Sequence, residues 1–179
     1  MGTLNLSSGV SLSATGTAFG NSAASWSDAP PGTIIQTVYG QSSMSSRDSF
    51  TSSTPSEIHT SHRTSITLRK SNSVVLVTYT VGWRQDGNSA LAYILPQVST
   101  DSGSSFSLFT DYTGSNNNEM FRNDAGDTYS FDTQTISFID WNTTAASRMY
   151  SLFCRVGTGT MYIGDNQPRP NMILHEIAQ

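Results

Sequence analysis

The sequence SVVLVTYTVGWR, residues 73–84, contains the longest apolar run in the chain. Alternation with a period of two, made of β-branched and aromatic residues, is typical of a β-strand. Val74 and Leu76 add apolar side chains to the opposite face at one end. We therefore predict a central strand of an all-β domain, buried on both faces where it begins. The residues that alternate are Val75, Val77, Tyr79, Val81 and Trp83.

The composition is that of a polar, weakly charged β-protein. Charged residues make up 12% of the 179 residues, about half of the usual share of roughly 25%. Serine and threonine, followed by glycine and asparagine, take their place. The aromatic content of 10% argues against a disordered tail, which has few aromatic residues and a high net charge. Such a composition is common in extracellular and virion β-proteins, and the length suits one domain with an accessory segment.

Several classes of function are disfavoured by charge and hydropathy. The net charge is −4, and the nine Lys and Arg residues are scattered, so we expect no nucleic-acid binding. No apolar run approaches the ~20 residues of a membrane span, and the first residues lack a secretory signal; we expect no membrane insertion. The lone cysteine, Cys154, cannot form an internal disulfide, and we predict a buried structural thiol. Nothing in the sequence calls for a cofactor.

The first 28 residues are predicted to form an N-terminal arm and linker. Apolar residues keep to even positions over about fifteen residues, and such a ribbon needs another surface to bury its apolar edge. It could add a strand to the domain's own sheet, or pack as an extended arm against identical arms or a partner. The Pro30-Pro31 pair places the start of the β-sandwich knob domain, residues 29–179, near Ala29. The arm residues expected to drive assembly are Leu4, Leu6, Val10 and Leu12.

The rest of the chain reads as short strands separated by turn signals. Asp86-Gly87 between two alternating runs predicts a hairpin turn at residues 85–88, and glycines at 157–159 predict another. Roughly eight to ten strands without a persuasive helix predict a jelly-roll-like antiparallel β-sandwich. The ranges expected to be strands are 33–39, 63–69, 73–84, 89–98, 106–110, 128–141, 147–156, 160–163 and 171–177.

Two long polar loops, residues 40–62 and 111–127, are candidates for ligand binding because long loops in compact domains are commonly functional. Aromatic and amide side chains in these loops could contact a carbohydrate, or could equally stabilise the loops themselves. The candidate ligand-binding residues are Phe50, Tyr112, Asn116, Asn117 and Asn118.

Metal binding has two weak candidates. His59 and His62 lie three residues apart, but Glu57 is the only acidic residue close to them in sequence. Residues 111–127 are rich in Asp and Asn, yet their spacing does not match an EF-hand, and turn formers in a solvated loop explain them. We expect no metal site, while a calcium ion in this loop stays open. The oxygen-bearing residues are Asp111, Asn116, Asn117, Asn118, Asn123, Asp124 and Asp127.

The sequence offers no convincing catalytic constellation. A glycosidase would need two carboxylates facing each other in a cleft, and spacing along the chain does not reveal such a pair. The three histidines have no Ser-His-Asp motif context. We predict that the protein is not an enzyme. The carboxylates considered were Asp101, Asp111, Asp132 and Asp140.

From Ala29 onward the chain resembles a family of bacteriophage virion domains found at the ends of tail fibres and in related head or tail appendages. APPGTIIQ at residues 29–36 is similar to the family's opening strand, and the segment from Ser65 into the 73–84 run resembles its step from strand through serine-rich turn to apolar strand. DWNTT at 140–144, followed by Tyr150, stands at the family's turn before the penultimate strand, without the usual proline. MILHEI at 172–177 resembles the closing strand, and MGTLNL at 1–6 resembles the start of small phage appendage proteins.

This resemblance implies a jelly-roll-like knob, usually a homotrimer, with binding loops at one end and no catalytic residues. We therefore expect a virion structural protein, a short fibre or decoration subunit that contacts other virion proteins through its arm. The alternative is a carbohydrate-binding module that recognises a host-surface polysaccharide; a capsid cement or tail adaptor without receptor binding is a further alternative.

Overall fold

The computed structural model describes residues 3–5, 11–13, 29–44, 47–108, 121–125, 129–141, 147–164 and 169–179. Within these ranges the chain consists of β-strands and loops, apart from one turn of 3-10 helix at Thr60–His62 (η2). No helix in these ranges is long and apolar enough to cross a membrane. The predicted all-β class is confirmed.

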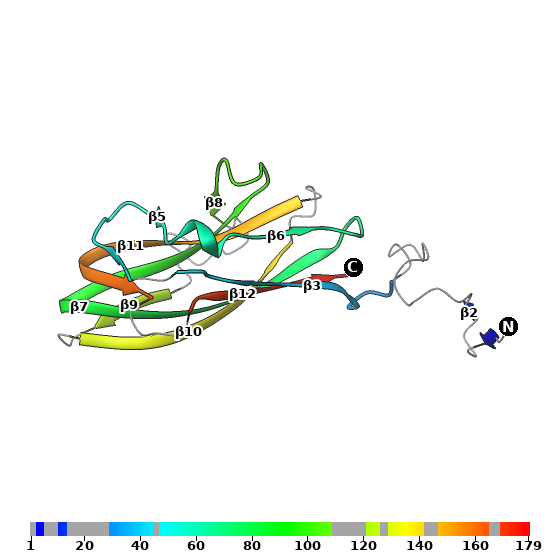
Figure 1. Ribbon diagram of the computed structural model, residues 1–179, viewed down its shortest axis with the longest axis horizontal. Coiled ribbons are helices and arrows are strands. Elements are labelled where there is room, and N and C mark those ends of the chain that lie inside the picture. Colours follow the sequence, from blue (N-terminus) through cyan, green and yellow to red (C-terminus); the bar gives the residue numbers. More distant parts are fainter. Residues whose placement is uncertain are drawn as a thin grey trace.

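Ten strands form an antiparallel sheet that folds over into two layers, and Figure 1 shows the layers one above the other. They are β3 (Ile34–Gln41), β4 (Asp48–Phe50), β5 (Ser56–Glu57), β6 (Thr64–Thr67), β7 (Val74–Ser99), β8 (Ser107–Leu108), β9 (Phe121–Ala125), β10 (Tyr129–Asp140), β11 (Ser147–Ile163) and β12 (Asn171–Ile177).

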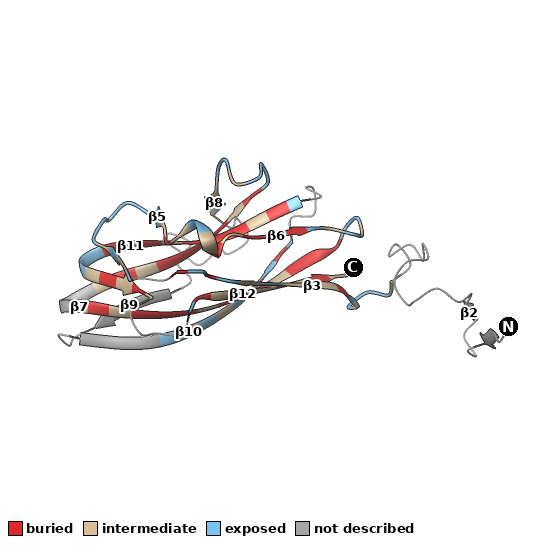
Figure 2. Cartoon of the chain, viewed as in Figure 1, coloured by how far each residue is buried: buried red, intermediate tan, exposed pale blue. Residues whose placement is uncertain are grey.

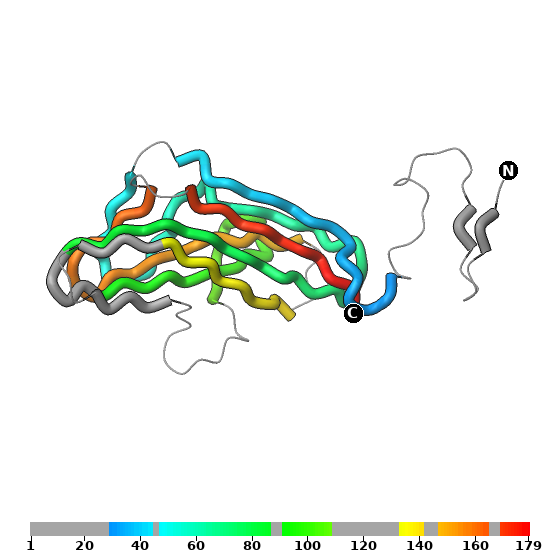
Figure 3. Tube along the Cα trace, turned by 90° about the horizontal axis from the view of Figure 1, so that it is seen from below, coloured from blue at the N-terminus to red at the C-terminus, as the bar shows by residue number. Residues whose placement is uncertain are grey.

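The long strand β7 belongs to both layers. Its first half pairs with β12 on one side and β10 on the other, and its second half pairs with β11, β9 and β8. The first sheet therefore has the order β3-β12-β7-β10, and these strands run side by side in Figure 3. The second sheet places β4, β5 and β6 on one edge of β11, with β7 on the other. This arrangement is the predicted jelly-roll-like sandwich.

The hairpin predicted at residues 85–88 is wrong. β7 continues through Asp86-Gly87, and its two halves pair with other strands rather than with each other. Along β7 the pairing with β10 and β9 keeps one register, since Asp86 lies opposite Tyr129 and Ala90 opposite Ala125. Asp86 is also paired with Thr160 of β11. Ladders on both sides of the strand thus override the local Asp-Gly turn preference.

The second predicted hairpin, at residues 157–159, is also absent, because β11 is one strand from Ser147 to Ile163. The glycines instead mark irregular pairing, with register shifts between Val156 and Thr158 and between Thr158 and Thr160. Gly159 has a φ of +81°, a conformation that glycine adopts without steric cost. An extra residue in one strand of a pair bends that strand. We therefore expect β11 to bend at these register shifts.

In the N-terminal segment, β1 (Thr3–Asn5) and β2 (Ser11–Ser13) pair with each other in a separate two-stranded sheet. Leu4 lies opposite Leu12 in this pair. Neither strand pairs with the ten-stranded sheet within the described residues. Leu6 and Val10 lie outside the described residues.

Alternating side chains from the two sheets meet in one core, and Figure 2 shows buried positions recurring along both layers. Trp83 and Tyr79 are among the largest fully buried side chains. Cys154 of β11 is also fully buried, and desolvation raises the pKa of its thiol to about 12. The prediction of a buried structural thiol is confirmed. The remaining members include Val75, Val77, Val81, Ala92, Ile94, Tyr150, Leu152, Val156, Met161, Ile163, Met172 and Leu174.

A buried ion pair joins the two sheets inside this core. Asp140 ends β10 in the first sheet, and Arg148 of β11 in the second sheet donates to its Oδ2. The hydroxyl of Tyr150 donates to the same oxygen over 2.9 Å. Burial and the nearby carboxylate raise the pKa of Tyr150 far above its usual value, so the hydroxyl remains a donor. Tyr79 adds a second link between the sheets by donating to the carbonyl oxygen of Ser151 over 3.3 Å.

A second buried carboxylate fixes the turn that leads into β7. Glu176 of β12 has no exposed surface. Its oxygens accept from the backbone N–H groups of Arg69 and Lys70, each at 2.9 Å, and from the side-chain amide of Gln36 at 2.6 Å. These bonds satisfy a carboxylate that would be costly to bury alone. They hold the connection between β6 and β7 against the first sheet. Asn72, which lies in this connection, takes a left-handed φ of +65°.

Replacement of Gly40 by alanine is expected to lower the free energy of unfolding by about 1–3 kcal/mol, the usual cost of overpacking. A Cβ on Gly40 of β3 would lie 2.0 Å from Oγ1 of Thr64 on β6. Urea titration measures the effect. Adding Thr64→Ala to Gly40→Ala should recover part of the loss, because it removes the clashing oxygen. A Gly40→Ala variant with an unchanged urea midpoint would show that the two strands do not approach this closely.

Candidate assembly surface

Most outward positions of the first sheet are uncharged, and we call these positions, named below, the uncharged face. Further along β7, the charged residues Arg84 and Asp86 lie on the same side of the sheet, opposite Phe131 and Tyr129 of β10. The residues of the uncharged face follow from strand alternation, because the intervening positions point into the core. The uncharged face consists of Ile34, Thr37, Tyr39 and Gln41 on β3, Asn171, Ile173, His175 and Ile177 on β12, Leu76, Thr78 and Thr80 on β7, and Thr133, Thr135, Ser137, Ile139 and Trp141 on and just after β10.

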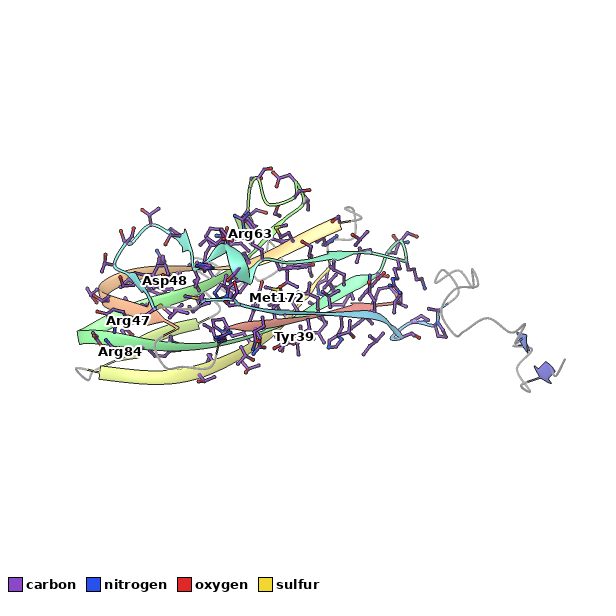
Figure 4. All side chains as sticks on the ribbon, in the orientation of Figure 1. Tyr39, Arg47, Asp48, Arg63, Arg84 and Met172 are labelled. Carbon is purple, nitrogen blue, oxygen red and sulfur yellow. The ribbon has the colours of Figure 1, made fainter. Side chains whose placement is uncertain are left out.

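Large apolar side chains gather on this face. Tyr39 is 59% exposed, Ile34 55%, Trp141 54% and Ile139 37%, and these are the large hydrophobic residues most open to solvent among the residues described. Figure 4 labels Tyr39 on the lower layer. Ile34 and Tyr39 lie on β3 and Ile139 and Trp141 at β10, the two edge strands of this sheet. Single exposed apolar residues are normal, whereas several on one face are typical of interaction surfaces.

Strand register arranges the uncharged face in rows. One row contains Thr37, His175, Leu76 and Ile139, and the next contains Tyr39, Ile173, Thr78 and Ser137. A third row is wholly polar, with Gln41, Asn171, Thr80 and Thr135. The face thus grades from apolar near Ile34 and Ile177, at one end of the sheet, to polar at the other end.

Polar side chains on the uncharged face form hydrogen bonds with polar side chains of the neighbouring strand. Thr78 Oγ1 lies 2.9 Å from Ser137 Oγ, and Thr80 Oγ1 lies 3.0 Å from Thr135 Oγ1. Thr37 Oγ1 lies 2.9 Å from Nδ1 of His175. These pairs already hold a partner within the sheet, which reduces the cost of covering the face with another molecule.

The second sheet has a different outer side, which carries charge and is partly covered. Arg63 makes two 2.8 Å hydrogen bonds to the Glu57 carboxylate, and its guanidinium carbon lies 5.0 Å from the ring centre of Phe106. Burial alone would raise the pKa of Glu57, but hydrogen bonds from Arg63 and Ser151 outweigh it and lower the pKa. Phe106 packs against Phe153 of β11 at 5.5 Å between ring centres. The two outer sides of the sandwich are therefore chemically distinct.

Of the predicted ligand-binding residues, the structure describes Phe50. Its side chain is partly buried and packs against the core, and β4 pairs it with Met161. The other four, Tyr112, Asn116, Asn117 and Asn118, lie outside the described residues, as does most of the calcium candidate loop.

The two loop histidines make contacts within the fold. Nδ1 of His59 lies 2.7 Å from Oγ of Ser61, and Nε2 of His62 lies 3.2 Å from Sδ of Met44. Their ring centres are 6.3 Å apart. No cluster of three or more His, Cys, Asp or Glu side chains suited to a metal ion occurs among the described residues.

Two of the four carboxylates considered for catalysis are described with their side chains. Asp140 is committed to the buried ion pair with Arg148. Asp101 organises its own turn, where hydrogen bonds from Ser105 and then Ser99 lower the pKa of its carboxyl. Asp111 lies outside the described residues, and so does the side chain of Asp132.

One aromatic and arginine cluster lies at the end of the sandwich labelled by Arg47 and Arg84 in Figure 4. The guanidinium carbons of Arg47 and Arg84 lie 4.6 Å and 4.5 Å from the ring centre of Tyr162. Arg84 also forms a 2.9 Å ion pair with Asp86. The sequence alone did not reveal this cluster, because its members are far apart in the chain. Arg47 directly precedes β4, Arg84 belongs to β7 and Tyr162 belongs to β11.

Comparisons with known proteins give no family assignment. No protein-family model matches the sequence, and no curated protein sequence matches it. Among solved structures, the chain is similar to Eiger TNF from S. frugiperda, with a TM-score of 0.47 and 9% sequence identity. That match covers 82% of this chain and 95% of the other. No function is transferred from a likeness at this level.

Proposed function

We propose that this chain is a structural protein of a phage particle, a short fibre or decoration subunit exposed on the surface of the virion. The observation that carries the proposal is the uncharged face on a β-sandwich, a surface suited to assembly rather than to chemistry. The resemblance of the opening, middle and closing strands to phage appendage domains points to the same role. The arm, residues 1–28, would dock on other virion proteins, and the domain would associate as a homotrimer.

The test of this function is the location of the protein. Antibodies raised against the purified chain should label intact particles, and the chain should be found in particles after gradient purification. Other structural proteins of the same particles serve as the positive control. If complete particles lack the chain and do not bind the antibody, the virion assignment is wrong.

A contribution to host attachment is the second candidate, and the cluster of Arg47, Arg84 and Tyr162 favours it. Arginine and aromatic side chains suit acidic and pyranose groups of polysaccharides. Immobilised host polysaccharide should retain the protein without releasing reducing ends, and Tyr162→Ala should weaken retention. Released reducing ends would instead show an enzyme, and equal retention of Tyr162→Ala would remove this cluster from consideration.

A further inference from the structure

We propose that Lys70 and Ala178 form a clamp that fixes the path on which the chain leaves the domain toward the N-terminal arm. The clamp holds the root of the arm, which we define as residues 29–33. Its contacts lie within the described part of the chain, whereas its role on a particle rests on the proposed function. There it would set the orientation of the domain relative to the virion protein on which the arm docks.

The root contains a β-turn that its own sequence favours. The N–H of Thr33 donates to the carbonyl oxygen of Pro30 over 3.1 Å, which closes a turn of four residues. Pro31 takes the second position of this turn, and Gly32 takes the third with a φ of +86°. Proline at the second position and a positive φ at the third are the features of a type II turn. The turn therefore directs the chain before any contact with the rest of the domain is made.

Two backbone hydrogen bonds fasten this turn to the residue that follows β12. The N–H of Gly32 donates to the carbonyl oxygen of Ala178 over 2.8 Å, and the N–H of Ala178 donates to the carbonyl oxygen of Thr33 over 2.9 Å. These bonds continue the pairing of β3 with β12 beyond its last pair, Ile34 and Ile177. Ala178 has no exposed surface, so this end of the sheet is packed against the domain.

Lys70 supplies the third contact of the clamp. Its Nζ donates to the carbonyl oxygen of Ala29 over 2.8 Å, and hydrogen bonds from a charged donor are stronger than those from a neutral one. The main chain of Lys70 is fixed in turn, because its N–H donates to the buried carboxylate of Glu176 over 2.9 Å. Figures 1 and 3 show the start of β3, the marked C-terminal end and the turn between β6 and β7 at the same end of the domain.

These contacts distinguish the root from an ordinary chain end. Residues at the edge of a domain are poorly ordered unless they are tied down, and here backbone and side-chain donors from two separate segments tie them. A segment that is already held in place loses less conformational entropy when it binds a partner. The clamp would therefore favour docking of the arm with the domain in one orientation.

The test measures backbone order at the root by nuclear magnetic resonance relaxation of the full-length chain. A rigid backbone has order parameters of about 0.85, and a flexible one has values under about 0.6. The N–H groups of Ala29, Gly32 and Thr33 should have rigid values in the unchanged chain. In Lys70→Met the value of Ala29 should fall under about 0.6, because the new side chain lacks the donor. Lys70→Arg keeps a cationic donor and should keep the rigid value.

Arg169→Met is the matched control, because it removes an exposed positive charge at the opposite end of β12. It should leave the order of the root unchanged. A chain truncated after Ile177 lacks both backbone bonds to Ala178. Exchange of its Gly32 N–H should become about fivefold faster, as expected for the loss of one typical hydrogen bond.

Circular dichroism must show that each variant is folded, and Lys70→Met alone decides the test if the truncated chain does not fold. An order parameter under about 0.6 at Ala29 in the unchanged chain overturns the clamp. A Lys70→Met variant whose root keeps the order of the unchanged chain overturns it as well.

The clamp and the proposed function can fail separately. An ordered root in a chain that is absent from purified particles leaves the clamp standing and contradicts the virion role. A mobile root in a chain that the particles contain contradicts the clamp alone.

Discussion

Replacement of Asp140 by alanine is expected to lower the free energy of unfolding by about 3–5 kcal/mol, the usual cost of removing one partner from a buried ion pair. The side chain of Arg148 is 2% exposed and that of Asp140 is 4% exposed. Without the carboxylate, a buried guanidinium loses the group that neutralises it, and the hydroxyl of Tyr150 loses its acceptor. Urea denaturation followed by tryptophan fluorescence or circular dichroism measures the loss.

The double variant Asp140→Leu with Arg148→Met separates the charge effect from lost packing. Replacing both partners of a buried pair by apolar side chains is commonly neutral or only mildly destabilising. The double variant should therefore be more stable than Asp140→Ala. If Asp140→Ala costs under about 1 kcal/mol, or if the double variant is the less stable of the two, the pair does not act as a buried charge pair.

Acid should weaken the fold through His62. Burial is the main reason that the pKa of His62 falls from 6.5 to about 4 in the folded protein, with the neighbouring His59 contributing. The unfolded chain then binds a proton more readily than the folded chain below pH 6.5, so protonation favours unfolding. The contribution is fully present above about pH 6.5 and is lost as the pH falls toward 4, by about 3 kcal/mol in total.

The variant His62→Gln lacks the titrating group and provides the comparison. Its free energy of unfolding should decline less between pH 7 and pH 4 than that of the unchanged protein, by about 3 kcal/mol. Carboxylates that do not interact with His62 titrate alike in both proteins, so their effect cancels in the difference. Glu57 does interact with His62, so its contribution is part of the measured difference. Parallel pH profiles for the two proteins would show that His62 is not held neutral by burial.

The alternation of apolar residues predicted the strands well, because burial on one face imposes a period of two on the sequence. The predicted strands at 33–39, 128–141 and 171–177 correspond closely to β3, β10 and β12. The errors came where a local turn signal competed with pairing between distant segments. Asp86-Gly87 has the composition of a hairpin turn, yet β10 and β11 occupy both sides of Asp86, and no local pattern contains that information.

The uncharged face shows a second limit of the sequence. The alternation around Ile173, His175 and Ile177 reveals two faces of one strand, but not which face another sheet will cover. From the sequence, Leu76 could equally be an outward residue or a residue buried on the second face of a central strand. The outward role of these positions emerges only when four strands lie side by side. The pairing of Asp140 with Arg148 is similar, since it depends on two strands in different sheets.

The position of β12 has a consequence for how the protein is made. Residues 171–177 come late in the sequence but lie between β3 and β7, at the centre of the first sheet. When the chain has been synthesised only as far as residue 164, β3 still lacks its neighbouring strand β12. The first half of β7 is then unpaired on the side where β12 will bind. Unpaired strand edges and exposed apolar surface favour aggregation in such intermediates. The first sheet therefore cannot be completed before residues 171–177 have been synthesised. A premature stop codon before these residues would leave β3 separated from β7.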